Sequence, residues 1–317
     1  MANFLLRRTL QLVLVMWGVA TILFVMFFVI SGNPAERIAS GGGARNPDPQ
    51  VVANLEKKLG IDKPKWEQYT TYMTNLVKGD LGESFRHRDL AVLDMVKQRA
   101  PTSLRLAFWA IIIEGVAGIG SGMLSARKRN SIGDYLTTIT AVIASAIPVF
   151  VLAYLLKQVT GVYAFEHDWP AWARFPPLGL GDDGWVLGVI PTGNTWKYLV
   201  QPAFVLASVS TAILARITRT SMLETMRLDH VRTARAKGLP ERLVMRRHVL
   251  RNAMIPVLTV AGLQFANLVT GTIVVENVFV LPGIGRLVFQ AISNRDLVVA
   301  PVGRRLCAGA PSRSGTP

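Results

Sequence analysis

The feature that most constrains this chain is an uncharged apolar run over residues 9–30. A helix needs about 20 apolar residues to cross a bilayer core of about 30 Å, and lipid leaves each backbone amide to find its partner within the helix. The run is too long for a secretory signal and no small-residue cleavage site is obvious behind it, so we interpret it as a retained first span. Four further spans are predicted at residues 103–124, 135–156, 199–215 and 253–275.

The composition agrees with a protein whose main solvent is lipid. Half of the 317 residues are hydrophobic and only 17% are charged, which is unusual for a soluble domain of this size. The lone cysteine, Cys307, cannot form an intrachain disulfide, and no cysteine and histidine cluster has metal-ligand spacing. The sequence therefore predicts an all-α polytopic membrane protein without a metal site or a redox role.

The positions of lysine and arginine predict the direction of insertion, because short cytoplasmic loops carry the positive excess. Arg7 and Arg8 place the N-terminus inside. With five crossings, residues 125–134 and 216–252 also lie inside, and the second of these segments holds ten lysines and arginines against three acidic residues. The net charge of +15 is therefore mostly a topology signal, and we expect no nucleic-acid partner.

Residues 31–100 are too polar to cross the bilayer and too long for a tight turn, so we expect a small extracytoplasmic subdomain. Residues 51–59 and 66–77 have helical patterns, and a glycine-punctuated turn follows at 79–85. Two interpretations are open: a cap on the bilayer surface, or a docking surface for a partner that delivers substrate. In the second outside segment, 161–198, tryptophans predict anchoring at the lipid interface.

The most informative segment is the basic loop at residues 216–252. Ala234 and Ala236 favour a helix, Gly238 can end it in the left-handed conformation, and Pro240 suits the first turn of the next helix. We expect a stiff helix, a sharp break and a second helix, which could transmit force from a soluble partner. The small residues would let that partner approach closely, and the arginines would favour an acidic rim on it. The open alternative is an amphipathic helix on anionic lipid headgroups.

A few polar residues within the apolar spans are candidates for a transport pathway. Glu114 is costly in lipid unless it faces water or a partner, so it contacts substrate or makes an interhelical hydrogen bond. Gln264, Asn267 and Thr270 recur at three-residue spacing and form one polar stripe, which lines a cavity or holds helices together. Segment 276–297 offers a re-entrant turn or an ordinary turn before another helix.

The basic loop resembles the coupling-loop signature of dipeptide and oligopeptide permeases of the ATP-binding-cassette (ABC) importers. The resemblance covers residues 1–297, and Arg232 and Thr233 depart from the general importer motif as in peptide-type permeases. Supporting matches lie at 79–85, 101–106, 147–150, 271–276 and 279–285. The residues that match the coupling signature are Arg232, Thr233, Ala234, Arg235, Ala236, Lys237, Gly238 and Leu239, followed by His248, Leu250, Arg251, Asn252, Ala253 and Pro256.

This resemblance implies a helical bundle of the type I ABC importer permease class in a bacterial cell membrane. It implies four partners: a second homologous permease subunit, two cytoplasmic ATPase subunits and an extracytoplasmic peptide-binding protein. The chain has no glycine-rich phosphate loop ending in Lys-Ser or Lys-Thr, so we expect no enzymatic activity, no catalytic residue and no cofactor of its own. The family shares its architecture among importers of dipeptides, oligopeptides, glutathione, nickel chelates and some sugars.

The sequence departs from the family after Asp296, where a final apolar helix is expected. Residues 302–317 form a polar tail rich in glycine, proline and serine, which predicts disorder and suggests a frameshifted or truncated end. The expected organisation is an N-terminal helix at 1–30, the subdomain at 31–100, a permease core at 101–297 and the tail at 298–317. The alternatives to an ATP-driven importer are an ATP-independent channel or ion-coupled transporter, and a remnant that only inserts.

Overall fold

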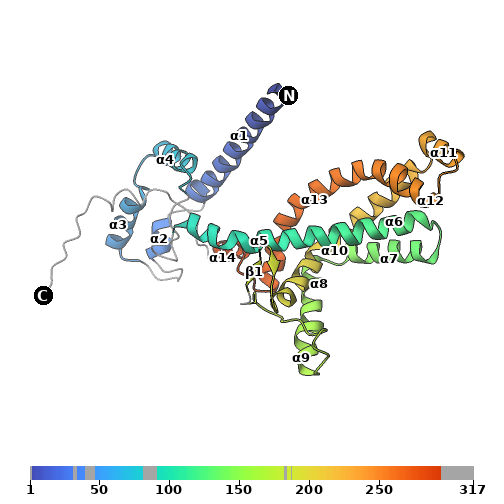
Figure 1. Ribbon diagram of the computed structural model, residues 1–317. Coiled ribbons are helices and arrows are strands. Elements are labelled where there is room, and N and C mark those ends of the chain that lie inside the picture. Colours follow the sequence, from blue (N-terminus) through green and yellow to red (C-terminus); the bar gives the residue numbers. More distant parts are fainter. Residues whose placement is uncertain are drawn as a thin grey trace. The chain divides into compact units, whose positions relative to one another are not determined.

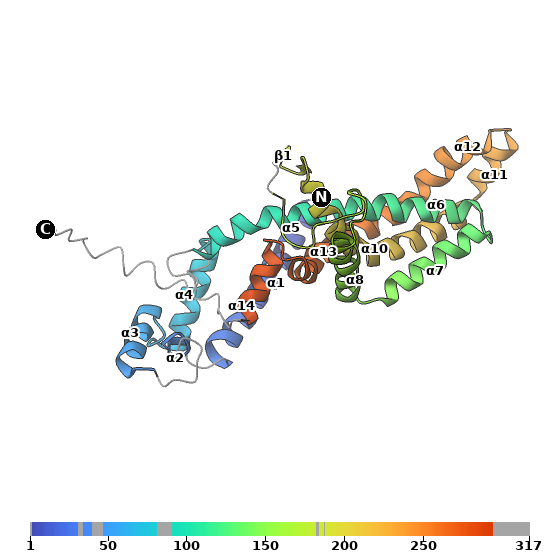
Figure 2. The same cartoon turned by 90° about the horizontal axis from the view of Figure 1, so that it is seen from below.

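The computed structural model of the protein describes residues 2–30, 34–39, 47–80, 91–181, 184–186 and 188–293. These residues are almost entirely helical (Figures 1 and 2), which confirms the all-α class predicted from the composition. The chain divides into two compact units, residues 1–98 with 290–317 and residues 99–289. The predicted tail at 298–317 and part of the predicted turn at 79–85 lie outside the described residues.

The first unit joins the N-terminal helix to the short helices of the polar segment. Its elements are α1 (Ala2–Phe24), η1 (Val25–Ile30), α2 (Pro34–Ala39), α3 (Pro49–Leu59) and α4 (Lys65–Val77). Asp48 caps α3 by accepting from the Gln50 amide, and Gly60 ends α3 in the left-handed conformation at φ +64°. The two helices predicted at 51–59 and 66–77 are therefore confirmed to within two residues at their starts.

Aromatic side chains hold the end of the N-terminal helix to α4. Phe24 packs on the rings of Phe28, Tyr69 and Tyr72, with ring centroids 4.8–5.7 Å apart. The hydroxyl groups of Thr21 and Tyr69 are 2.8 Å apart. Residues 3–17 of α1 are all exposed, as expected for a helix surrounded by lipid.

The second unit is a bundle of long helices with one small hairpin. Helix α5 begins in the first unit and continues into the second. In chain order its elements are α5 (Val92–Glu114), η2 (Gly115–Ile119), α6 (Gly120–Arg127), α7 (Ile132–Ala146), α8 (Val149–Leu156), η3 (Lys157–Tyr163), α9 (Ala164–Glu166), β1 (Trp185–Val186), β2 (Ile190–Pro191), α10 (Thr195–Thr225), α11 (Asp229–Ala236), α12 (Glu241–Leu243), η4 (Val244–Leu250), α13 (Arg251–Val278) and α14 (Ile284–Ser293).

Five helical runs among the described residues are long and apolar enough to span a membrane. They are Asn3–Ile30, Val92–Arg127, Val149–Glu166, Thr195–Thr225 and Glu241–Val278. The number agrees with the sequence prediction, but the bounds differ, because several helices extend beyond their apolar centres.

The predicted third span at 135–156 is wrong in its bounds, because two helices occupy this segment. Pro148 has no amide hydrogen to donate, and it forces the residue before it out of the helical conformation. Ile147 is accordingly extended at φ −81° and ψ 122°, between the end of α7 and the start of α8. Helix α7, with 15 residues, is about 22 Å long and does not cross a bilayer alone.

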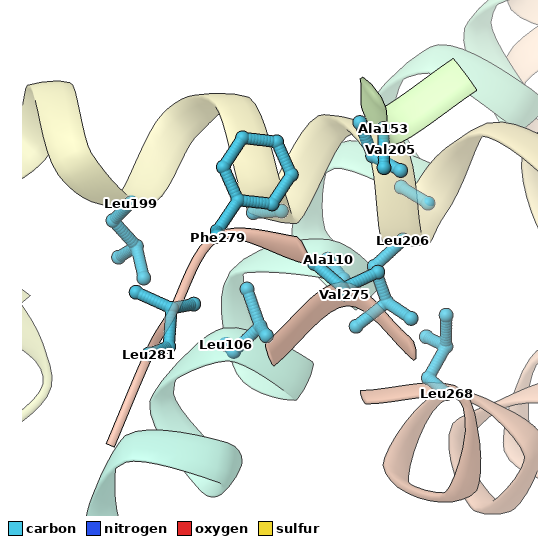
Figure 3. Close-up of a cluster of buried hydrophobic side chains, with 12 residues drawn as sticks. Leu106, Ala110, Ala153, Leu199, Val205, Leu206, Leu268, Val275, Phe279 and Leu281 are labelled. Atoms are coloured by element: carbon cyan, nitrogen blue, oxygen red, sulfur yellow. The ribbon is translucent and has the colours of Figure 1, made fainter. Parts of the chain in front are cut away.

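Helix α10 is the centre of the second unit. It packs against α6, η2, α7, α8 and α13, and Figure 1 shows α6, α7 and α10 side by side. The main apolar cluster forms where α10 meets α5 and α13 (Figure 3). There Leu106, Phe279 and Leu281 are almost fully buried against Leu199 and Val205 of α10.

Helices α6 and α10 approach so closely at Gly122 that a side chain there is excluded. A Cβ atom on Gly122 would lie 2.6 Å from both the Ala215 carbonyl oxygen and the Thr218 Cβ, whereas one on Gly120 would meet nothing within 4 Å. We therefore expect Gly122→Ala to lower stability by about 1–3 kcal/mol through overpacking, and Gly120→Ala to have no such effect. Thermal unfolding of the purified variants checks this, and equal midpoints would contradict it.

The end of the bundle away from α11 is held by a buried carboxylate. Glu276 of α13 is fully buried, accepts from the Ser103 hydroxyl of α5 at 2.6 Å and accepts from the Arg286 amide at 2.9 Å. Ser103 Oγ in turn accepts from the Ile284 amide at 2.8 Å. These bonds cap the first turn of α14. Over residues 276–293 the structure has a turn followed by the helix α14.

Candidate functional site: a helical knob at the end of the bundle

The knob is residues 226–240, which connect the end of α10 to the long helical run Glu241–Val278. It consists of a short connection, the two-turn helix α11 and a turn, as predicted from the sequence. Figure 1 places α11 and α12 together, at the end of the unit where α6 leads into α7. Both neighbouring runs are long helices, so the knob is held at both of its ends.

One face of α11 packs into a small apolar core that fixes the knob to the bundle. Val231 is fully buried and Ala234 is 4% exposed. They join Ala126 of α6, Met222 of α10 and Val244 of η4, and Leu239 packs against the same cluster. The knob is therefore a packed element rather than a loose loop.

The turn after α11 depends on a glycine and is bridged by an ion pair. Gly238 has φ +75°, a conformation that costs other residues about 1–2 kcal/mol, and its amide donates to the Arg235 carbonyl at 2.9 Å. Arg235 donates twice to the Glu241 carboxylate, at 2.8 and 3.1 Å. That carboxylate, through these hydrogen bonds, raises the pKa of the Arg235 guanidinium above its ordinary value.

A polar contact also joins the start of the knob to the following helix. The side-chain amide of Asn252 lies 3.0 Å from His230 Nε2 and donates to the His248 carbonyl, also at 3.0 Å. Asn252 and His248 belong to the motif singled out in the sequence, whereas His230 and Glu241 were not identified there. No local sequence pattern indicates His230 or Glu241, because Asn252 is 22 residues from His230 and Arg235 is six residues from Glu241.

The outer face of α11 is exposed and basic. Arg232, Thr233, Ala236 and Lys237 are all exposed. The carboxylate of Asp229 lies 3.8 Å from Arg232, a distance at which exposed charges attract only weakly. This face suits contact with an acidic rim. Ala234 does not belong to it, because its side chain is buried in the apolar core; its role in coupling to a partner stays a prediction.

A partly buried ion pair lies within the bundle, near the end that carries the knob. Arg219 of α10 donates to both carboxylate oxygens of Asp134, at 2.8 Å each, and to the Ser125 hydroxyl at 3.1 Å. Ser125 also donates to Asp134. The Asp134 side chain is 6% exposed. These bonds join α6, α7 and α10 less than two turns before α10 ends, and sequence analysis did not identify them.

Glu114 is the predicted pathway residue on α5. Glu114 is fully buried, and neither of its carboxylate oxygens has a hydrogen-bond partner among the described residues. The Ser210 hydroxyl of α10 lies close to this carboxylate and donates to the Ala207 carbonyl of its own helix at 3.1 Å. Both interpretations of Glu114, a substrate contact and an interhelical hydrogen bond, stay predictions.

The polar stripe on α13 is split between the inside and the outside of the unit. Gln264 is buried and accepts from Asn267 at 2.8 Å, while Asn267 and Thr270 are exposed. The Thr270 hydroxyl donates to the Ala266 carbonyl of its own helix. Gln264 therefore joins the packing of the bundle, and Asn267 and Thr270 face outward from it.

Two neighbouring cavities between α6, α7 and α10 carry more hydroxyl groups than the predicted stripe. Their volumes are about 220 and 180 Å³, and they share Ser121 and Thr137. Thr220 and Arg219 also line the larger cavity, and Ser208 and Thr211 the smaller one. Over the described part of the chain, no group of three or more histidine, cysteine, aspartate or glutamate residues could hold a metal ion.

The long apolar helices are those of a multi-pass membrane protein, and the match to the family models below makes it a permease of the importer class. The fold is that of a type I ABC importer permease. The chain belongs to the family of binding-protein-dependent transport system inner membrane components, whose model matches residues 118–303. The model of the N-terminal part of the same components matches residues 1–107.

Similar proteins cover nearly the whole chain. The dipeptide transport system permease protein DppB of Alkalihalophilus pseudofirmus is 38% identical, over 96% of this chain and 92% of the relative. The oligopeptide transport system permease protein OppB of Escherichia coli strain K12 is 35% identical, over 93% and 89%. The di/tripeptide transport system permease protein DppB of Pseudomonas aeruginosa is 36% identical, over 97% and 93%.

Proposed function

We propose that this chain is the membrane-spanning subunit of an ATP-driven importer that moves short peptides into the cytoplasm by alternating access. The observation that carries the proposal is the knob, a helix packed on one face and exposed and basic on the other, within a chain that belongs to the permease family. The names of its relatives specify dipeptides, oligopeptides, di/tripeptides and glutathione, which supports short peptides as the substrate class.

In this proposal the assembly has two cytoplasmic ATPase subunits, and the knob receives force from one of them. A second, similar permease and an extracytoplasmic peptide-binding protein complete the assembly, in a bacterial cell membrane with the N-terminus inside. ATP binding draws the ATPases together and displaces the knob, and the bundle alternates between outward-open and inward-open states. Residues 232, 233 and 235–237 contact the ATPase, while Val231, Ala234 and Leu239 transmit its displacement to α6, α10 and α13.

The alternative functions make different demands on the knob. An ATP-independent channel or ion-coupled transporter continues to transport when ATP is removed and needs no soluble partner. A remnant without transport activity inserts into the membrane and retains no ATPase. Recovery of an ATPase with the purified chain therefore separates the importer from both alternatives.

Gly238→Pro is expected to abolish most ATPase recovery. Proline fixes φ near −65°, whereas Gly238 requires +75°, and it removes the amide that bonds Arg235. Gly238→Asn is the matched control, because asparagine tolerates the left-handed conformation and a Cβ there meets nothing within 4 Å. We expect recovery per inserted permease to fall about tenfold or more for proline and to be nearly unchanged for asparagine.

The measurement is coexpression with candidate ATPases, purification through the permease and normalisation to the permease found in the membrane fraction. If the unaltered chain recovers no ATPase, or if labelling places the knob outside the cell, the importer proposal fails. Equal ATPase recovery by Gly238→Pro and Gly238→Asn would show that the knob does not contact the ATPase.

A further inference from the structure

A groove beside the knob combines an apolar floor with a basic rim. It lies between α6 and the start of the helical run Glu241–Val278, and its volume is about 500 Å³. Met123, Leu124, Met245 and Leu250 give it apolar walls, and Met222 of α10 lies among its lining residues. These residues are separate from the exposed outer face of α11.

The charge at the groove is one-sided. Arg127, Arg242 and Arg246 are exposed and line it. Glu241 is the acidic residue among the lining residues, and its carboxylate is already bonded to Arg235. Within the described residues, the side chains of Arg242 and Arg246 make no hydrogen bond or ion pair. The rim therefore has guanidinium groups free to bind an anion, and a guanidinium fits two phosphate oxygens at once.

The position of the groove along the helices favours one kind of occupant. Its apolar walls belong to the ends of two helical runs that are long enough to span a membrane. Arg127 is the last residue of the first run, and Arg242 and Arg246 lie near the start of the second, before α13. This places the apolar part at the edge of the hydrocarbon layer and the basic rim at the level of the headgroups. An anionic phospholipid matches this arrangement, because its phosphate lies at the headgroup level and its acyl chains lie in the hydrocarbon layer.

We propose that this groove binds an anionic phospholipid of the cytoplasmic leaflet, with its phosphate on Arg242 and Arg246 and an acyl chain against Met123 and Met245. The assignment of the leaflet rests on the orientation in the proposed function. The bound lipid fills the space between α6 and the base of the knob. It thereby makes the position of the knob depend on the composition of the membrane.

The test measures lipid retained by the purified full chain. Native mass spectrometry of the chain, equilibrated with equal amounts of phosphatidylglycerol and phosphatidylcholine, should show selective retention of phosphatidylglycerol. The double variant Arg242→Gln/Arg246→Gln should lower that retention about tenfold or more. Lys128→Gln/Arg129→Gln is the control, because it removes the same charge from exposed residues that do not line the groove.

Equal loss in both double variants, or no preference for phosphatidylglycerol in the unaltered chain, would overturn the site. A second measurement uses no variant. A photoreactive phosphatidylglycerol should label residues 120–127 and 241–250, and excess unlabelled phosphatidylglycerol, but not phosphatidylcholine, should prevent the labelling. Cross-linking of the groove to an ATPase without any lipid adduct would also overturn the proposal. Lipid retention is measured without an ATPase. A loss of lipid retention therefore contradicts the lipid site alone, and a loss of ATPase recovery contradicts the proposed function.

Discussion

Asp134→Leu is expected to lower the thermal unfolding midpoint of the purified protein by roughly 6–12 °C. The substitution leaves Arg219 without the carboxylate that accepts two of its hydrogen bonds. Removing one member of a buried pair costs about 3–5 kcal/mol, because the remaining charge stays buried and uncompensated. The lower end of this range applies here, since the Arg219 side chain is 30% exposed and solvent screens part of its charge.

The double variant Asp134→Leu/Arg219→Met should recover much of the lost stability, because it removes both charges and keeps apolar volume. Asp168→Asn is the matched control, since Asp168 is 91% exposed and pairs with Arg174 at 3.3 Å. It should leave the midpoint unchanged. If Asp134→Leu unfolds at the same temperature as the unaltered chain, the pair does not hold α7 to α10.

Gly283→Ala should destabilise the opposite end of the bundle by about 3 kcal/mol or more. A Cβ atom there would lie 2.2 Å from the Glu276 carboxylate, so the carboxylate has to move. Its movement breaks the bonds from Ser103 and Arg286, each of which costs about 1–3 kcal/mol when left unmade in a buried site. The overpacking itself adds about 1–3 kcal/mol.

Gly262→Ala is the control for this prediction, because a Cβ at Gly262 meets nothing within 4 Å. The measurements are the thermal unfolding midpoint and the rate of trypsin cleavage at Arg286, which should become accessible when α14 leaves its place. Unchanged cleavage in Gly283→Ala would contradict the role of Glu276 as the cap of α14.

The elements that sequence predicted well are those with a complete local signal. Helices α3 and α4 have amphipathic patterns, and Gly60 ends α3 in the conformation that glycine favours. The five spans follow from apolar runs, but hydropathy detects only the part of a helix that lies in lipid. Helix α10 therefore continues to Thr225, ten residues beyond the predicted span at 199–215. The predicted span at 135–156 ran through Pro148, because hydropathy does not register the backbone break that this proline causes.

The contacts of the site were harder to predict, because their partners are distant in sequence. Arg219 meets Asp134 across 85 residues, and Ser103 meets Glu276 across 173. The sequence predicted the left-handed turn at Gly238, but it did not predict that Ala234 points into the apolar core. The three-residue spacing of Val231 and Ala234 places both on one face of α11, and this pattern could have indicated it.

The uninterrupted course of α10 limits how this subunit can change shape. Its 31 residues extend about 46 Å, from the end that holds Glu276 to the knob, in contact with α6, α7, α8 and α13 along the way. Sliding or turning α10 alone would break the contact at Gly122 and the Asp134 pair together. In the proposed importer, we therefore expect a push on the knob to tilt the subunit as one body, and we expect the passage for cargo along the seam with the second permease rather than between these helices.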